Sequence, residues 1–66
     1  MDEQSYRVEG MTCDHCVAAV TREVQSVPGV ADVAVTLDDG RLVVQGTDVE
    51  TEAVRAAVAE AGYTLV

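Results

Sequence analysis

Residues 32–45 read DVAVTLDDGRLVVQ, and this stretch predicts a β-hairpin. Before the turn, large apolar residues alternate with small or polar ones, as in a strand with one buried face. Asp39 and Gly40 form a favoured two-residue turn, because both residue types tolerate positive φ. Residues 41–45 are therefore expected to pair back antiparallel to the first arm, and Gly46 ends the second arm.

A helix is predicted on the N-terminal side of this hairpin. Apolar residues recur there at intervals of three and four, which places them on one stripe of a helix whose opposite side is polar. Pro28 and Gly29 are expected to end the helix. The residues of the predicted apolar stripe are Val17, Val20, Val24 and Val27.

A second helix is predicted on the C-terminal side of the hairpin. Residues 47–50 read TDVE, the form of a capping box, in which a hydroxyl and a carboxylate each satisfy a backbone N–H at the helix start. Gly62 is expected to supply a left-handed cap at the helix end. The apolar residues expected to face the core are Val54, Ala57, Val58 and Ala61.

Two outer strands complete the predicted order of elements. Residues 5–9 alternate, with Tyr6 and Val8 on one face, and residues 63–66 suffice for a short last strand. The order is strand, helix, strand, strand, helix, strand. It predicts an α+β, ferredoxin-like βαββαβ sandwich, with a four-stranded antiparallel sheet and both helices on one face. A chain of 66 residues forms one domain, which we expect to span residues 1–66.

The charge balance narrows the range of partners. Twelve acidic residues oppose four basic ones, and the net charge is −8. Such a chain opposes the phosphate neutralisation that nucleic-acid binding requires. No run approaches the roughly 18 apolar residues of a membrane helix, and the N-terminus is unlike a signal peptide. We therefore expect a cytoplasmic protein that neither binds nucleic acid nor inserts into a membrane.

The chain has two cysteines, Cys13 and Cys16, which stand at the predicted start of the first helix. Two intervening residues bring the two sulfurs together. Unpaired backbone N–H groups and the positive end of the helix dipole favour the thiolate there. Because thiolate is the form that attacks disulfides and binds metals, the pair predicts a metal site or a redox site.

Counting ligands separates these possibilities. A closed zinc site needs four protein ligands, an iron–sulfur cluster needs four thiolates, and a c-type haem needs His where Val17 stands. A thioredoxin-like oxidoreductase also places CxxC at a helix start, although its fold needs more residues, and a purely structural cysteine pair remains a further alternative. Two thiolates satisfy Cu(I), a monovalent d10 ion. An exposed two-ligand site would also admit an incoming thiolate, which favours transfer over storage.

Residues 10–16, GMTCDHC, closely resemble the GMTCxxC signature of the heavy-metal-associated domain family. The similarity continues through VAAV at residues 17–20, VPGV at 27–30 and AGY at 61–63, so it covers nearly the whole chain. Within the family, the sequence is similar to bacterial-type copper chaperones and to the N-terminal metal-binding domains of copper-transporting P-type ATPases.

The resemblance implies a function as well as a fold. It implies that Cys13 and Cys16 bind Cu(I), which is delivered by ligand exchange to a copper-transporting P-type ATPase or a copper-responsive regulator, without enzymatic activity. The initial Met and the absence of a linker favour a free chaperone over an excised ATPase domain. We expect a monomer in which two CxxC loops could share one metal ion and so bridge a dimer.

Four neighbouring residues are expected to support the metal site. Thr12 stands where zinc-transporting relatives carry Asp, so the resemblance favours copper over zinc. Met11 is expected to pack inward and fix the loop. His15 is expected to be exposed, as a group that adjusts the cysteines' surroundings or serves as an occasional third ligand. Tyr63 is expected near the metal, like its counterpart in bacterial copper chaperones.

Overall fold

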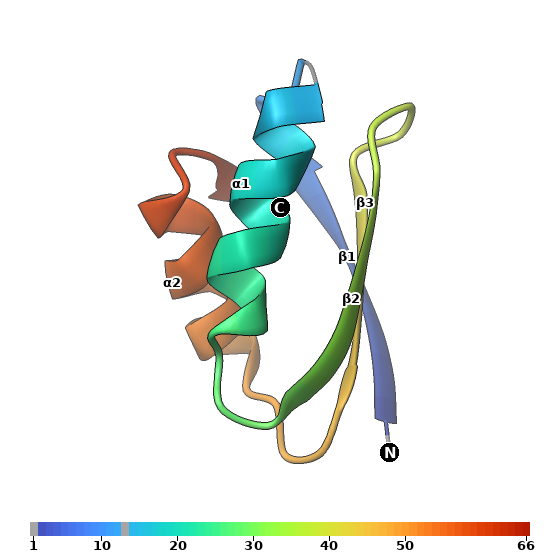
Figure 1. Ribbon diagram of the computed structural model, residues 1–66, viewed down its shortest axis with the longest axis vertical. Coiled ribbons are helices and arrows are strands. Elements are labelled where there is room, and N and C mark those ends of the chain that lie inside the picture. The colour runs from blue at the N-terminus through green and yellow to red at the C-terminus, as the bar shows by residue number, and fades with distance from the viewer. Residues whose placement is uncertain (1, 13) are drawn as a thin grey trace.

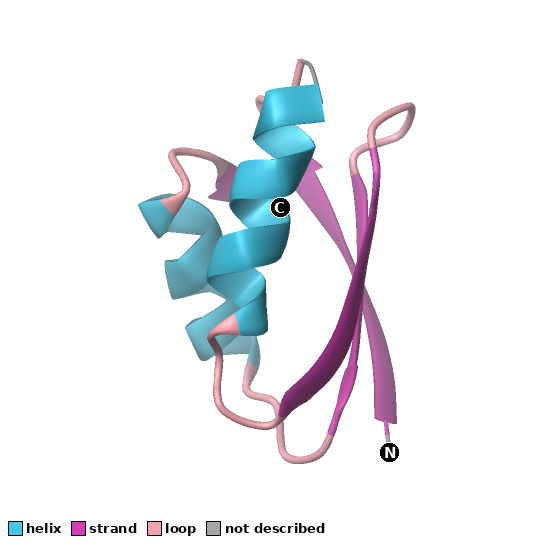
Figure 2. Ribbon diagram, in the orientation of Figure 1, coloured by secondary structure: helices cyan, strands magenta, loops and turns pink. Residues whose placement is uncertain are grey.

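The computed structural model confirms the predicted architecture, and its description covers residues 2–12 and 14–66. Figures 1 and 2 show two helices packed side by side against one face of a twisted sheet, whose other face is open. The elements in chain order are β1 (Asp2–Glu9), α1 (Asp14–Gln25), β2 (Val30–Thr36), β3 (Arg41–Gly46), α2 (Thr51–Glu60) and β4 (Thr64–Leu65).

The sheet has the strand order β2-β3-β1-β4 and is antiparallel throughout. Strand β1, one of the two central strands, begins at Asp2, earlier than predicted, and pairs with β3 from Asp2 to Arg7. The last strand is shorter than predicted, because β4 pairs only with Val8 and Glu9. Beyond β4, the backbone N–H of Val66 still donates to the carbonyl oxygen of Arg7 at 2.8 Å.

The hairpin between β2 and β3 turns more widely than predicted. Thr36 pairs with Arg41, so residues 37–40 form a four-residue turn in place of a two-residue one. Gly40 has φ +67°, whereas Asp39 is not among the described residues with positive φ. Instead, the Asp39 carboxylate accepts a hydrogen bond from the Arg41 backbone N–H at 3.1 Å. The side chain thus stabilises the turn without a left-handed backbone at Asp39.

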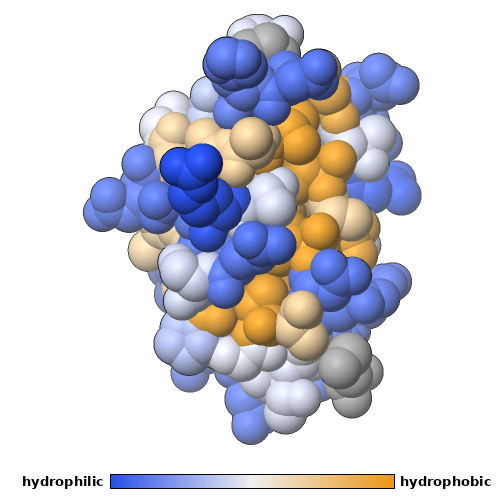
Figure 3. All heavy atoms as spheres, viewed as in Figure 1, coloured by the Kyte–Doolittle hydropathy of each residue, from blue (hydrophilic) through white to orange (hydrophobic). Residues whose placement is uncertain are grey.

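The core lies between the helices and the inner face of the sheet and consists mainly of valine. Burying each such side chain contributes about 1.5–3 kcal/mol. These small side chains leave part of the core boundary uncovered: Figure 3 shows hydrophobic atoms at the surface in a strip beside α1. The side chains that are almost completely inaccessible are Leu42, Val20, Val24, Val44, Val54 and Val58.

The apolar stripe of α1 differs from the prediction at its first member. Val20 and Val24 are fully buried and Val27, just beyond the helix, is buried as well. Val17, however, is only half-buried, and Cys16 is buried in its place. Positions 16, 20 and 24 are four residues apart and therefore share a face of the helix, which turns Val17 toward the edge of that face.

The predicted capping box at the start of α2 is wrong. The helix begins at Thr51, with Glu50 at the N-cap position and no side-chain hydrogen bond to the cap. Thr47 instead donates its backbone N–H to the Gly29 carbonyl at 2.9 Å, and Asp48 has φ +56°, so the chain is still turning at these residues.

The predicted cap at the end of α2 is confirmed. Gly62 has φ +95°, its N–H donates to the Ala59 carbonyl at 2.9 Å, and the Tyr63 N–H donates to the Val58 carbonyl at 3.1 Å. Glycine adopts this left-handed conformation without the steric cost of a Cβ. The cap therefore ends α2 and sends the chain back toward β4.

Candidate metal centre

Residues 10–12, called the metal loop below, follow β1 at the end of the sheet where the hairpin also turns (Figure 1). Cys13, one of the two predicted metal ligands, lies outside the described residues. The Val8 N–H donates to the Gly40 carbonyl at 2.7 Å, which ties the end of β1 to the hairpin. The hairpin thus forms one wall beside the metal loop.

Cys16, the other predicted ligand, lies in the first turn of α1 and is only 7% exposed. The expectation of an exposed pair of sulfurs is therefore wrong for Cys16. Its burial follows from the helix period, because Cys16 stands one turn before Val20 on the face that meets the core. The Thr12 Oγ1 lies 3.9 Å from the Cys16 Sγ, within hydrogen-bond distance for sulfur.

The donor set of the described residues is small. Residues 2–12 and 14–66 contain no group of three or more His, Cys, Asp and Glu side chains placed to hold a metal ion. Cys16 is buried, and the Thr12 hydroxyl lies within hydrogen-bond distance of its sulfur. Sulfur suits a soft metal ion better than a hard one, which prefers oxygen ligands.

Met11 and Tyr63 hold the metal loop by packing, as the sequence predicts for Met11. Both side chains are half-buried and pack against the core. A Cβ placed on Gly10 would lie 3.3 Å from Cδ1 of Tyr63, so this ring rests directly on the loop. A Cβ on Gly40 would lie 3.9 Å from the methyl carbon of Met11. The metal loop therefore packs against the turn after α2 and against the hairpin.

His15 lies on the outer side of α1. It is exposed, as predicted, and lines a shallow hollow together with Asp14 and Arg22. Ala18 and Ala19 also line this hollow. The described structure therefore places His15 at the surface beside the start of α1.

Gly40 contributes to the site in a way that the sequence does not indicate. The sequence predicts only a turn residue, yet the Gly40 carbonyl accepts a hydrogen bond from β1, and a Cβ on Gly40 would lie next to Met11. No short-range pattern signals this contact, because the hairpin and the metal loop are far apart in sequence and meet only through the sheet.

Comparisons with known proteins place this geometry in a family. The model of the heavy-metal-associated domain matches residues 5–64. A copper chaperone CopZ of Staphylococcus aureus is 34% identical over 68 residues and is aligned over 100% of both chains. The copper-transporting ATPase 1 of Rhizobium meliloti is 43% identical over 61 residues, which cover 91% of this chain but only 7% of that ATPase.

The fold comparison agrees with the sequence comparison. A solved CopZ metallochaperone superimposes with a TM-score of 0.93 at 33% identity, covering 98% of this chain and 100% of the other. In the part of the chain that the structure describes, neither helix has the length and hydrophobicity needed to cross a membrane. Because the family model matches most of the sequence, the chain belongs to the heavy-metal-associated domain family.

Proposed function

We propose that this protein binds Cu(I) through Cys13 and Cys16 and delivers it to a copper-transporting ATPase or a copper-responsive regulator. The observation that carries the proposal is the position of Cys16, in the first turn of α1 with the Thr12 hydroxyl 3.9 Å from its sulfur. The helix N-terminus and this hydroxyl both stabilise a thiolate. Two thiolates complete the coordination of Cu(I) but leave Zn(II) short of ligands.

Transfer follows from the low ligand number. A two-coordinate ion accepts a third thiolate from a partner before either original bond breaks, so the ion is never released into water. Because Cys16 is buried, we propose that its bond to copper breaks last and that exchange begins at Cys13. The protein thus acts as a carrier in the cytoplasm and catalyses no reaction of its own.

The relatives support both copper binding and copper delivery. A copper chaperone CopZ aligns with the full length of this chain, and copper-transporting ATPases contain a segment similar to it. The chain spans only 7–8% of those ATPases, so the similarity concerns a metal-binding segment and not the transport machinery. The likeness over the full length of CopZ favours the role of carrier.

Anaerobic competition for Cu(I) against a colorimetric chelator tests the proposal. The wild type should withdraw one equivalent of Cu(I), and both Cys13→Ser and Cys16→Ser should lose this ability. His15→Ala serves as the matched control, because it changes the exposed residue next to Cys16 in the first turn of α1 without removing a sulfur, and it should bind like the wild type. Wild-type affinity in either Cys→Ser variant would contradict the two-sulfur site.

An insulin-reduction assay tests the competing oxidoreductase function. A dithiol oxidoreductase turns over disulfide substrates at a rate set by its thiolate and by its redox potential. We expect no turnover above the rate of the thiol reductant alone. Sustained turnover that disappears in Cys16→Ser would replace the carrier function with redox catalysis.

A further inference from the structure

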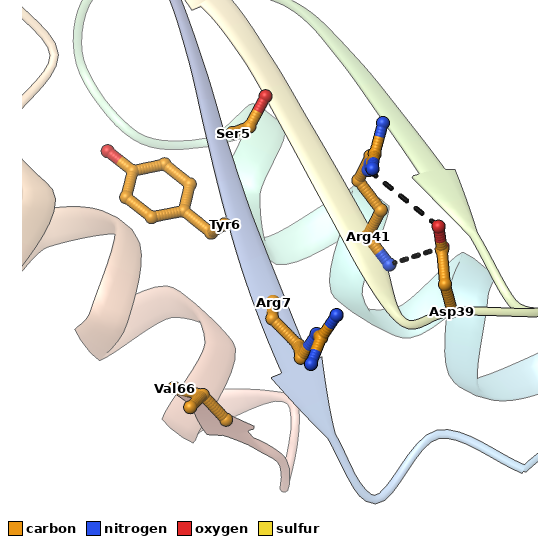
Figure 4. Close-up of a pocket in the computed structure, with 6 residues that line it drawn as sticks. All are labelled: Ser5, Tyr6, Arg7, Asp39, Arg41 and Val66. Atoms are coloured by element: carbon orange, nitrogen blue, oxygen red, sulfur yellow. Dashed lines mark hydrogen bonds and ion pairs between the residues drawn. The ribbon is translucent and has the colours of Figure 1, made fainter.

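Strand β1 has a free edge along its N-terminal half. On one side β1 pairs with β3 from Asp2 to Arg7, but on the other side β4 pairs only with Val8 and Glu9. Over residues 2–6, no strand of the described chain pairs with this second side. Figure 4 shows the arrangement: β4, which leads to Val66, lies along only one end of β1.

The direction of the backbone groups on this edge follows from one hydrogen bond. The Arg7 carbonyl accepts from the Val66 N–H, so the backbone groups of Arg7 point away from β3. Backbone direction alternates along a strand, and Ser5 and Glu3 therefore point their N–H and C=O groups to the same side. Unpaired groups in a row on an edge strand are a template for another strand.

Two arginines lie side by side on this part of the sheet, and only one of them forms an ion pair with a described residue. Arg7 is directly opposite Arg41 on β3, and two like charges at such positions repel each other. The Arg41 Nε lies 3.7 Å from the Asp39 carboxylate, whereas Arg7 forms no ion pair with any described residue. Arg7 would therefore be stabilised by a carboxylate arriving from the free edge. Glu3 is on the same open face, at the other end of that edge.

We propose that the free edge of β1 pairs antiparallel with β1 of a second copy of this chain, with Gln4 opposite the partner's Gln4. In this register β4 keeps its place, because pairing is confined to residues 2–6. Glu3 and the partner's Ser5 exchange both backbone hydrogen bonds, and the symmetric pair does the same. The result is one continuous sheet built from two four-stranded sheets, with all helices on the same face.

The register also places opposite charges within reach. Each Glu3 is a diagonal neighbour of the partner's Arg7 on the open face, and long side chains interact across such diagonals. The two Glu3 side chains are diagonal neighbours as well, so two attractive contacts act against one repulsive contact. The net charge of −8 on each copy adds long-range repulsion, which salt screens more than it screens the close contacts. Pairing should therefore strengthen with salt.

Sedimentation equilibrium of the reduced, metal-free protein tests this dimer. A metal chelator excludes dimers that are bridged by metal through the cysteines. We expect the weight-average mass to rise from 7.0 kDa toward twice that value as protein and salt concentrations increase. The backbone amides of Glu3 and Ser5 should become protected from hydrogen exchange over the same range. A mass that stays at 7.0 kDa in high salt at millimolar protein would overturn the proposal.

Three variants separate edge pairing from general association. Ser5→Pro removes an N–H that the monomer does not use, and it should abolish the dimer. Glu3→Arg should also abolish it, although removing one carboxylate and adding one guanidinium changes the net charge from −8 to −6, which by itself favours association. The double variant Glu3→Arg/Arg7→Glu should restore the dimer, because it exchanges the two charges. Stronger association of Glu3→Arg alone would refute the register, whether or not Ser5→Pro folds.

Discussion

The two loops that precede the helices occupy equivalent positions in the two halves of the fold but are stabilised differently. The metal loop lies at one end of the sheet, and residues 47–50 lie at the opposite end (Figure 1). The packing of the Met11 and Tyr63 side chains holds the metal loop in place. The loop of residues 47–50 combines the packing of Val49 against the core with close contacts between backbone segments.

The backbone around residues 46–49 lies very close to other parts of the chain. The Thr47 N–H donates to the Gly29 carbonyl at 2.9 Å, and a Cβ on Gly46 would collide with the same carbonyl oxygen. The Val49 carbonyl accepts from the Gln4 side chain at 3.4 Å. The close approach of two backbone segments fixes the position of this loop, so we expect this end of the molecule to support stability, whereas the metal-loop end carries the proposed copper site.

The largest effect is expected from Gly46→Ala. Its new methyl group would overlap the Gly29 carbonyl, so the two backbones must separate, which should lower the free energy of unfolding by about 3 kcal/mol. Gly62→Ala is the comparison variant. Gly62 has φ +95°, so an alanine is strained there, but nothing lies within 4 Å of its added Cβ, and the substitution should cost about 1 kcal/mol. Urea denaturation measures both variants, and equal losses would show that the close approach is unimportant.

Met11→Ala tests the metal-loop end. Removing this half-buried side chain should lower the free energy of unfolding by about 1.5 kcal/mol and weaken copper binding about tenfold, because the loop loses its packing against Gly40. Met11→Leu keeps the volume without the thioether sulfur and should retain binding. Should Met11→Leu bind copper as poorly as Met11→Ala, the sulfur itself and not the packing would be responsible.

Tyr6→Phe tests a side-chain contact at the end of the molecule where residues 47–50 and the start of α2 lie. The Tyr6 hydroxyl is hydrogen-bonded to Gln4 and lies 3.2 Å from the Thr51 hydroxyl at the start of α2. Its removal should lower the free energy of unfolding by about 1 kcal/mol and leave copper affinity unchanged. A change in copper affinity would show that the two ends are coupled.

The smallest effect is expected from Glu50→Ser. Glu50 occupies the N-cap of α2 without a side-chain hydrogen bond, and Ser can accept one from the backbone of the first turn. The free energy of unfolding should rise by only about 0.5 kcal/mol, because the gain from the new cap is partly offset by the loss of the favourable charge of Glu50 near the helix N-terminus. Thermal unfolding at constant ionic strength detects the change, and a fall in stability would mean that the charge outweighs the cap.

Periodicity and local turn signals predicted the order of the elements and most of the core. The valines at helical spacing and the cap at Gly62 are examples, because both depend on residues close together in sequence. The capping box failed because a long-range hydrogen bond from Thr47 to Gly29 keeps the chain out of the helix.

The candidate site was predictable in its residue types but not in its environment. The spacing of the cysteines indicated a metal loop, and the inward packing of Met11 was expected. The burial of Cys16 was not, because it depends on which of two adjacent residues, Cys16 or Val17, faces the core. That choice is made by the packing of α1 on the sheet, which a short sequence pattern does not specify.

X-ray absorption spectroscopy of the protein loaded anaerobically with one equivalent of copper tests the proposed two-sulfur site. We expect the absorption edge of a monovalent copper ion and two sulfur atoms as its nearest neighbours, and we expect Cys16→Ser to lose this two-sulfur coordination. An ion that remains divalent, or a shell dominated by nitrogen or oxygen atoms, would contradict it.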